Sequence, residues 1–270
     1  MQYILVTGAA GGMGQKAVAC FRQSGFCVFA LDSKVGAEEE GVIWLKADVT
    51  DAKSVQQAFE TVQSYTPKLY AIVHFVGVYL LDSLIEIDAQ RFSDAFRINL
   101  FGAYQINKIF LPLLQQNGRI LITTSELATL DPLPFTGLYA VTKSALDKYA
   151  YSLCMELQLL GIHVSVLRAG AVQTGMLGVS TDALDDFCKR TALYSYNGAR
   201  FRRIVERVET KSVLPETIAR KAMHILRAKH PHFAYSVNRN PLLLLLNLLP
   251  KRLQLYIVRC ILKGETSCSR

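Results

Sequence analysis

A tyrosine and a lysine spaced four residues apart, Tyr139 and Lys143, could together carry out acid–base chemistry. Both lie in a predicted helix, where residues four apart share one face. A lysine ammonium near a phenol favours the phenolate, so we expect Lys143 to lower the pKa of Tyr139 from about 10 toward the working range. Tyr139 could then act as a general acid or base. The alternative is an ordinary surface pair, because this spacing is common in helices.

A glycine-rich segment, residues 7–14 (TGAAGGMG), lies where a predicted strand gives way to a helix. Its candidate cofactor-binding residues are Gly8, Gly12, Met13 and Gly14. Glycines allow a tight turn and a close approach of the backbone to a pyrophosphate, while the helix N-terminus offers free N–H groups to the anion. The segment therefore predicts a dinucleotide site, and a tight turn without a ligand is the alternative.

Two acidic residues at the ends of predicted strands could hold the adenosine half of such a cofactor. Asp32, 24 residues after Gly8, could accept hydrogen bonds from the ribose hydroxyls and would repel a 2′-phosphate. This predicts NAD rather than NADP, although Lys34 weakens the preference. Asp48 and Val49 could contact the adenine edge, and a helix cap is an equally good interpretation of Asp48.

The elements that must position these residues alternate short apolar runs with longer helical patterns, which is typical of βαβ units. The predicted strands are residues 3–7, 27–31, 42–46, 69–75, 119–124, 163–168 and 233–237. The predicted helices are residues 13–24, 52–65, 89–116 and 138–160, two short Arg-rich helices within 175–213, and one beginning at Pro215. With 270 residues, 51% of them hydrophobic, and no dividing linker, we expect one α/β domain with a doubly wound, seven-stranded parallel Rossmann sheet.

In order and spacing, these motifs resemble those of the short-chain dehydrogenases/reductases. The residues that carry the resemblance over residues 1–240 are the glycine motif of residues 7–14, Asn99, Ser125, the pair Tyr139 and Lys143, and residues 170–174 (GAVQT). The resemblance implies that Tyr139 exchanges a proton with the substrate oxygen while Ser125 hydrogen-bonds that oxygen. It also implies that Lys143 binds the nicotinamide ribose and that Asn99 holds a water linking Lys143 to solvent.

The same resemblance assigns Val172 and Thr174 to the nicotinamide carboxamide and Gly77 to the adenosine. Three departures from the family pattern stand out. Residues 74–77 read HFVG where the family has Asn-Asn-Ala-Gly, and we expect His74 to be a buried structural residue. Ala169 replaces a proline before residue 170. Ser125 and Tyr139 are 14 residues apart, one more than is usual, so Thr124 is a reserve candidate for the hydroxyl role.

The second part of the chain is strongly basic: residues 1–188 carry a net charge of −5 and residues 189–270 one of +13. Residues 175–213 take the place of the family's substrate-binding loop. We expect a largely apolar inner face, formed by Met176, Leu177, Val179, Leu184, Phe187, Leu193, Tyr194 and Tyr196. Residues 239–270 form an apolar and basic extension, which could pack on the core, form a lid over an apolar cavity, or lie on an anionic membrane surface. Alternatively, the basic residues could simply form a solvent-exposed face of ordinary helices. Without an aromatic-interleaved basic motif, we expect no nucleic-acid partner.

Targeting and redox signals are mostly negative. The N-terminus lacks the features of a signal peptide, and the apolar run at residues 242–249 is too short to span a bilayer. Six cysteines occur without CxxC pairs, which argues against a disulfide framework and against a zinc site. We therefore expect no metal and a cytoplasmic protein, peripheral to a membrane if the extension binds one.

The resemblance implies an NAD-dependent oxidoreductase acting on a bulky apolar secondary alcohol or ketone, with a hydroxysteroid or bile-acid-like sterol favoured. An alternative substrate is a 3-hydroxyacyl thioester or a small polyol. A second alternative is a non-catalytic NAD-binding sensor, which the presence of both Tyr139 and Lys143 disfavours. The predicted helices 89–116 and 138–160 match those that the family uses for homodimer and homotetramer contacts.

Overall fold

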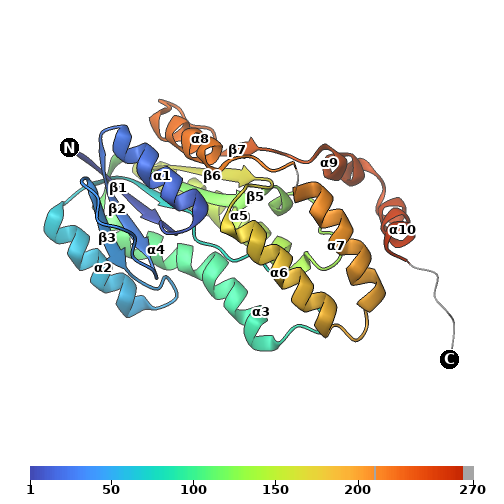
Figure 1. Ribbon diagram of the computed structural model, residues 1–270. Helices are drawn as coiled ribbons and strands as arrows, with labels where there is room; N and C mark the ends of the chain where they lie inside the picture. Colours follow the sequence, from blue (N-terminus) through green and yellow to red (C-terminus); the bar gives the residue numbers. More distant parts are fainter. Residues whose placement is uncertain (210, 264–270) are drawn as a thin grey trace.

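A parallel β-sheet of seven strands forms the core of the computed structural model, which describes residues 1–209 and 211–263 (Figure 1). In chain order the strands are β1 (Gln2–Thr7), β2 (Phe26–Asp32), β3 (Val42–Lys46), β4 (Leu69–His74), β5 (Leu114–Ser125), β6 (His163–Ala169) and β7 (Ala234–Val237). The strand order in the sheet is β3-β2-β1-β4-β5-β6-β7. The chain thus winds outward in both directions from β1 and β4, where doubly wound sheets bind ligands. The predicted fold class is confirmed.

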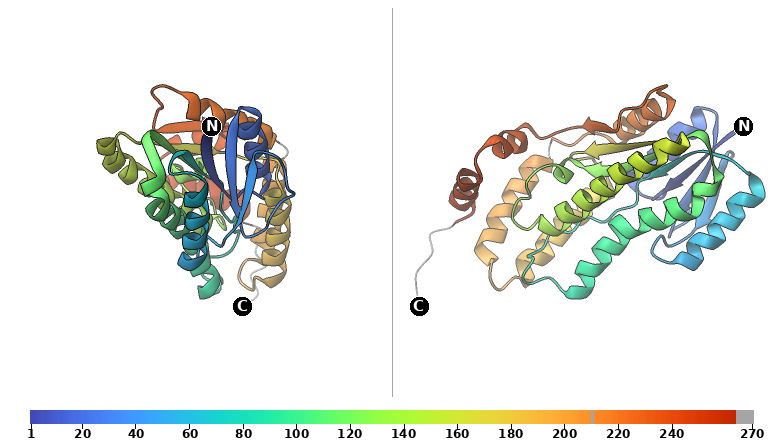
Figure 2. Two further views of the ribbon diagram at one scale, coloured as in Figure 1. Left: turned by 90° about the vertical axis from the view of Figure 1, so that its left-hand side faces the viewer. Right: turned by 180° about the vertical axis from the view of Figure 1, so that it is seen from behind.

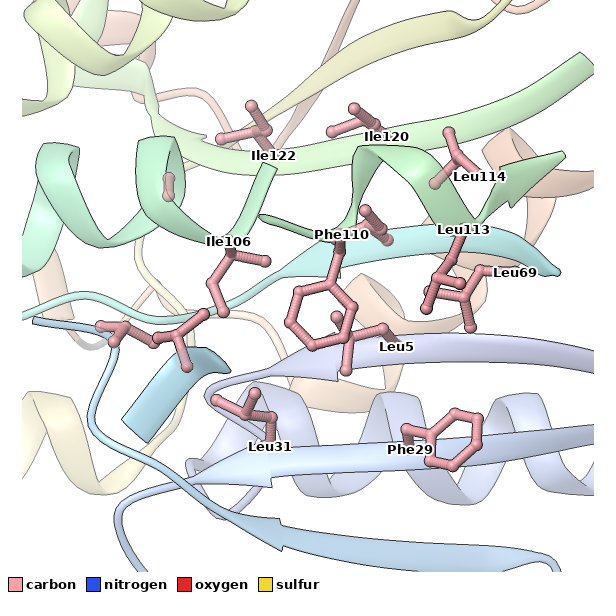
Figure 3. Close-up of a cluster of buried hydrophobic side chains, with 14 of the residues drawn as sticks. Leu5, Phe29, Leu31, Leu69, Ile106, Phe110, Leu113, Leu114, Ile120 and Ile122 are labelled. Carbon is pink, nitrogen blue, oxygen red and sulfur yellow. The ribbon is translucent and has the colours of Figure 1, made fainter. Parts of the chain in front are cut away.

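The central strands are apolar on both sides because helices cover both faces of the sheet. One face is covered by α2 (Ala52–Tyr65), α4 (Gly102–Phe110) and α5 (Gly137–Leu157). Figure 3 shows Ile106 and Phe110 of α4 among the side chains of the strands, and both are fully buried. The opposite face is covered by α1 (Gly12–Gln23) and α8 (Pro215–Arg227), with Phe21 and Ile218 buried against it.

The predicted helix over residues 89–116 is wrong in its continuity and its end. The structure has α3 (Ala89–Phe96), a π-helical turn (Arg97–Phe101), α4 and a 3₁₀ turn (Leu111–Leu113). The 3₁₀ turn contains Pro112, which lacks the N–H that a continuing helix needs. Strand β5 then begins at Leu114, five residues before the predicted start, with a register shift against β4.

Four helices lie at the end of the molecule away from the N-terminus, as Figures 1 and 2 show. They are α6 (Gly175–Arg190), α7 (Ser195–Glu209), α9 (Pro241–Leu248) and α10 (Lys251–Leu262). The two predicted helices within residues 175–213 are therefore present. Side chains from α6, α7 and α10 join the loop after β4 in a separate apolar cluster of Leu81, Leu184, Phe187, Phe201 and Leu262.

The expected apolar inner face of residues 175–213 is confirmed only in part. Leu184 and Phe187 are buried, whereas Leu193 and Tyr196 are exposed because they lie in and after the connection between α6 and α7. The side chains at positions 175–182 lie outside what the structure describes, and these include three that we had placed on that face: Met176, Leu177 and Val179. Within the described residues, no helix is both long and apolar enough to cross a membrane.

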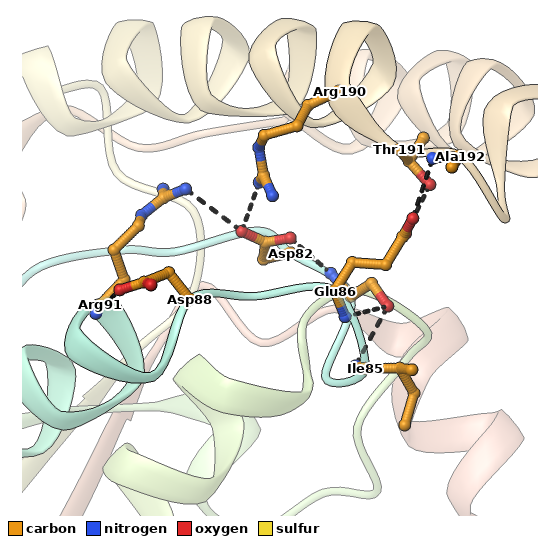
Figure 4. A network of polar contacts seen from close by, with 9 residues as sticks. Asp82, Ile85, Glu86, Asp88, Arg91, Arg190, Thr191 and Ala192 are labelled. Atoms are coloured by element: carbon orange, nitrogen blue, oxygen red, sulfur yellow. Dashed lines mark hydrogen bonds and ion pairs between the residues drawn. The ribbon is translucent and has the colours of Figure 1, made fainter.

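Acidic residues in the loop after β4 attach this loop to the end of α6 (Figure 4). Asp82, 1% exposed, accepts hydrogen bonds from Arg91 at 3.3 Å and from Arg190 at 2.6 Å. Glu86 accepts hydrogen bonds from the Thr191 hydroxyl at 2.6 Å and from the Ala192 N–H at 2.8 Å. These contacts fix α6 and its C-terminal connection relative to the sheet.

A buried ion pair holds α5 against the sheet. Asp147 on α5 accepts two hydrogen bonds from Arg168 on β6, at 3.0 and 2.8 Å, and one from the Thr124 hydroxyl on β5 at 3.2 Å. Thr124 and Arg168 are paired in the sheet, so one carboxylate joins three elements. Asp147 lies one helical turn beyond Lys143, and the ion pair therefore also positions the candidate catalytic face of α5.

We predict that Asp147→Ala lowers the free energy of unfolding by about 3 kcal/mol, because it leaves Arg168 without its partner in a largely buried site. Urea unfolding measures this change. The matched control is Asp94→Ala, which removes an exposed pair with Arg97 and should cost less than about 1 kcal/mol. Equal losses for the two variants would contradict the assigned role of Asp147.

Candidate active site

The glycine turn between β1 and α1 is closely packed at the two ends of its motif. Gly8 has a φ of +71°, and a Cβ there would lie 2.6 Å from the Val76 nitrogen. A Cβ on Gly14 would collide with the Gly8 carbonyl. Larger side chains are therefore excluded, and the backbone of the turn is left bare at the carboxyl edge of the sheet.

The N-terminus of α1 follows directly, with Gly11 as an N-cap that has no side-chain capping bond. The positive end of the helix dipole and its N–H groups thus face the turn. Met13 in the first turn of α1 lines the large pocket described below, and Gly12 packs close to Thr174. A bare turn leading into an uncapped helix fits a pyrophosphate.

Asp32 lies beside this turn at the end of β2. One carboxylate oxygen accepts a hydrogen bond from the Ala10 N–H at 3.0 Å, and the other accepts one from the Lys34 N–H at 3.1 Å. The carboxylate therefore ties the glycine turn to β2. Each oxygen has further acceptor capacity, so the same residue could also bind ribose hydroxyls.

The adenine-side candidates differ in exposure. Val49 is buried against Gly102, whereas Asp48 is exposed and accepts two 2.8 Å hydrogen bonds from Thr50. The interpretation of Asp48 as a helix cap is wrong, because Asp51 caps α2 by accepting a hydrogen bond from the Lys53 N–H. Asp48 instead closes the turn that precedes the helix.

Tyr139, Lys143 and Ser125 line one pocket at the carboxyl ends of β4, β5 and β6. Met13 and Gly77 also line this pocket, together with Val172 and Thr174 from the segment after β6. Tyr139 is in the first turn of α5, and its ring packs edge-to-face against Tyr79 with centroids 4.5 Å apart. The structure thus brings Ser125, at the end of β5, together with Tyr139 and Lys143 of α5.

Lys143 is buried one turn after Tyr139. Its Nζ atom donates a hydrogen bond to the Thr123 carbonyl at 3.3 Å and lies 5.9 Å from the centre of the Tyr139 ring. Gly77 leaves room for it, since a Cβ there would lie 3.0 Å from Nζ.

Burial controls the charges in this pocket. It raises the pKa of Tyr139 to about 12, with the nearby Glu126 charge acting in the same direction and a hydrogen bond to Ser125 acting against it. Burial also lowers the pKa of Lys143 to about 8. The expectation that Lys143 brings the pKa of Tyr139 below 10 is therefore wrong for this structure, because burial disfavours the phenolate more than the Ser125 hydrogen bond favours it. At neutral pH, Tyr139 holds its proton.

Asn99 lies in the π-helical turn and is 2% exposed. Its amide accepts a hydrogen bond from the Val78 N–H at 2.7 Å and donates to the Val78 carbonyl and the Thr142 hydroxyl, each at 3.0 Å. The side chain therefore clamps the segment after β4 to α5, next to Lys143 and Gly77. π-Helical turns often occur at functional sites.

Two further candidates have structural partners. The hydroxyl of Thr124, the reserve for Ser125, is bound to Asp147, although Thr124 also lines the pocket. His74 is buried between Thr7 and Asn107, and burial lowers its pKa to about 4. It is a neutral structural histidine, as the sequence predicts.

The sequence did not single out several pocket residues. Glu126 follows Ser125 directly and is 7% exposed. Its place after a candidate catalytic residue at a strand end was a usable signal. Asn240 and Leu243 of the C-terminal segment also line the pocket, and no local pattern could have placed them there.

A family model described as short chain dehydrogenase matches residues 2–185, and the chain belongs to this family. The chain is 29% identical over 192 residues to the NADPH-dependent 1-acyldihydroxyacetone phosphate reductase of Schizosaccharomyces pombe, covering 67% of this chain and 65% of that protein. It is 25% identical over 238 residues to the 3-ketodihydrosphingosine reductase of Bacteroides thetaiotaomicron, covering 87% of each. It is 31% identical over 207 residues to estradiol 17-beta-dehydrogenase 2 of Mus musculus, covering 69% of this chain and 54% of that protein.

Solved structures show the same fold. One is the 3-ketoacyl-(acyl-carrier-protein) reductase from Brucella melitensis complexed with NADH, which is 20% identical, with a TM-score of 0.72 over 87% of this chain and 96% of that one. Another is the aldohexose dehydrogenase of Thermoplasma acidophilum, which is 16% identical, with a TM-score of 0.73 over 89% of this chain and 95% of that one. These likenesses concern the fold, and the family model shows the family.

Proposed function

We propose that this protein interconverts a bulky apolar secondary alcohol and its ketone, with Tyr139 as the proton donor and acceptor. The observation that carries the proposal is the convergence of Tyr139, Ser125 and Lys143 on one pocket that begins at the glycine turn. Away from that turn, the pocket wall is largely apolar. It is formed by Tyr79, Leu133, Phe201, Ile204, Val205 and Leu243.

The proposed chemistry divides into hydride and proton transfer. A nicotinamide coenzyme bound beside Tyr139 would supply or accept the hydride. In reduction, the Tyr139 hydroxyl donates its proton to the substrate oxygen, while the Ser125 hydroxyl stabilises the developing charge. At neutral pH the Tyr139 hydroxyl carries the proton that reduction requires. Oxidation requires the Tyr139 phenolate, which burial disfavours. Asn99 remains the proposed link between Lys143 and solvent.

The glycine turn and the N-terminus of α1 are proposed to hold the pyrophosphate, including Gly8, Gly12, Met13 and Gly14. Asp32 is proposed to bind the adenosine ribose, and Lys143 the nicotinamide ribose. Asp48, Val49 and Gly77 would contact the adenosine, and Val172 and Thr174 the carboxamide. The charge of Asp32 supports NAD over NADP. The S. pombe relative is named as NADPH-dependent and the Brucella structure holds NADH, so relatives of both kinds exist.

The names of the relatives support an apolar substrate, because estradiol, ketodihydrosphingosine and acyldihydroxyacetone phosphate are all lipids or steroids. A hydroxysteroid or bile-acid-like sterol remains the proposed class, and a 3-hydroxyacyl thioester is the second candidate. The apolar wall disfavours a small polyol. A non-catalytic sensor has no need of a tyrosine, a serine and a lysine in one pocket.

We propose one catalytic domain in which residues 175–213 and the extension from residue 239 enclose the substrate. Asn240 and Leu243 line the pocket, as a lid requires. The extension is attached to the loop after β5: Asn247 accepts a hydrogen bond from the Asp131 N–H at 2.6 Å, and Lys251 forms an ion pair with Asp131. The alternative in which the extension packs on the core holds in part: no residue of α9 is buried, whereas Leu262 of α10 lies in the apolar cluster with Phe187 and Phe201.

The outer side of this extension supports the proposed peripheral membrane contact. Leu242, Leu245 and Leu248 are 69%, 60% and 81% exposed, and residues 239–263 carry five basic and no acidic side chains. Leucines beside basic residues suit an anionic lipid surface. The contact would place the pocket near a source of apolar substrate.

We also propose that the protein is cytoplasmic and forms a homodimer or homotetramer through α4 and α5. The exposed side chains of Tyr104, Tyr151 and Met155 on these helices support this proposal.

Tyr139→Phe should lower kcat/KM for ketone reduction by at least about 10²-fold, because it removes the proton donor. Coenzyme binding, measured by fluorescence titration, should be unchanged. Tyr151→Phe is the matched control, since this tyrosine lies on the exposed side of the same helix. Turnover retained by Tyr139→Phe would refute the assignment.

Asp32→Asn keeps one side-chain oxygen that can accept the hydrogen bond from the Ala10 N–H of the glycine turn, but it removes the charge that repels a 2′-phosphate. We expect the ratio of kcat/KM for NADPH to that for NADH to rise about tenfold or more, equivalent to about 1.4 kcal/mol. Glu60→Gln, at an exposed acidic residue of α2, is the control. An unchanged ratio would show that Asp32 does not select the coenzyme.

Vesicles of anionic lipid should sediment the wild-type protein at low salt and release it at high salt. A variant with Leu242, Leu245 and Leu248 replaced by serine should lose most of this binding. Leu159→Ser, at an equally exposed leucine outside the extension, should retain it. Absence of wild-type binding at low salt would end the membrane proposal.

A further inference from the structure

Glu126 places a carboxylate in the same pocket as the proposed catalytic residues. It follows Ser125 at the carboxyl end of β5, is 7% exposed, and lines the pocket together with Tyr139. Much of the pocket wall is apolar, and a buried carboxylate is costly there unless a cation or hydrogen-bond donors compensate for the lost water.

The compensation inside the protein is incomplete. One oxygen, Oε2, accepts a hydrogen bond from the Asn240 N–H at 2.7 Å. Arg239 adds a more distant favourable charge, but burial dominates and raises the pKa of Glu126 above its ordinary value. Among the residues that the structure describes, none hydrogen-bonds Oε1 or forms a salt bridge with Glu126. This carboxyl group therefore has capacity for one more donor, within the pocket.

The charge of Glu126 also acts on Tyr139, because it raises the pKa of the phenol. By itself this effect opposes the transfer of the Tyr139 proton to substrate. A positive group bound beside Glu126 would satisfy the free oxygen and offset this effect at once. The pocket thus combines a carboxyl group, one oxygen of which has no hydrogen-bond donor among the described residues, with a largely apolar wall.

We propose that Glu126 determines specificity by accepting a hydrogen bond from a substrate ammonium close to the reacting carbon. The substrate class is then an apolar amino ketone and the corresponding amino alcohol, with the hydrocarbon part along Leu133, Phe201 and Leu243. This inference rests on the proposed oxidoreductase function and narrows its substrate.

A purely structural role for Glu126 is distinguishable. If its task were only to anchor Asn240 at the start of α9, a glutamine would serve, because its amide oxygen can accept the same N–H. Glu126→Gln therefore keeps the anchor and removes the charge, whereas Glu126→Ala removes both.

The test compares a long-chain 2-amino-3-ketone with the ketone of the same chain that lacks the amine. The wild type should prefer the amino ketone in kcat/KM by about tenfold or more, in line with a hydrogen bond to a charged group. Glu126→Gln should lose this preference, so that its kcat/KM values for the amino ketone and the plain ketone differ by less than about threefold. For oxidation of the plain alcohol, its pH profile should shift to lower pH, because the charge that raises the pKa of Tyr139 is gone.

Three results overturn the proposal: no preference in the wild type, an undiminished preference in Glu126→Gln, or a stronger preference for the matching hydroxy ketone. Calorimetric binding of the amino alcohol and the plain alcohol to Tyr139→Phe separates this proposal from the proposed function. Tighter binding of the amino alcohol, together with a wild type that turns over neither ketone, would show that the reaction is wrongly assigned while the role of Glu126 stands. Turnover of the plain ketone with no preference for the amine would show that the reaction is correctly assigned and that the role of Glu126 is wrong.

Discussion

Burial of Tyr139 and Lys143 in one pocket sets the protonation of both groups, and the contacts around them keep that pocket together. A phenol and an ammonium in one pocket, with a carboxylate at Glu126, have charges set by burial as much as by one another. Such a group of residues is useful only if its members cannot move apart. The Asp147–Arg168 pair holds α5 to the sheet, and Asn99 clamps the loop after β4 to α5. These structural contacts therefore support the chemistry.

The sheet could be predicted because each buried strand is a short apolar run and each helix has clear ends. Residues 42–46 and 52–65 have the predicted limits in the structure. The prediction failed between Ala89 and Leu114, where the apolar pattern continues through four different backbone conformations. The π-helical turn at Asn99 depends on contacts with Val78 and Thr142, which are distant in sequence, and no local pattern reports them.

The site could be predicted where function demands a spacing along one element, as for the glycine turn and for Tyr139 and Lys143. The direction of the Tyr139 pKa shift could not, because spacing reveals a nearby charge but not the loss of water around both groups. Glu126 and Leu243 were missed for a related reason. Their place in the pocket depends on α9 returning to β5, through the contact between Glu126 and Asn240. The burial of the Glu126 carboxyl group and the place of Leu243 in the pocket wall are properties of the tertiary structure.

A crystal structure with NADH and an unreactive analogue of a reducible ketone would test whether Tyr139 and Ser125 bind the reacting oxygen. We expect the analogue's carbonyl oxygen to lie within about 3.2 Å of both the Tyr139 and Ser125 hydroxyls, with the nicotinamide ring against the carbonyl carbon. A carbonyl oxygen bound elsewhere, or a nicotinamide ring remote from Tyr139, would contradict it.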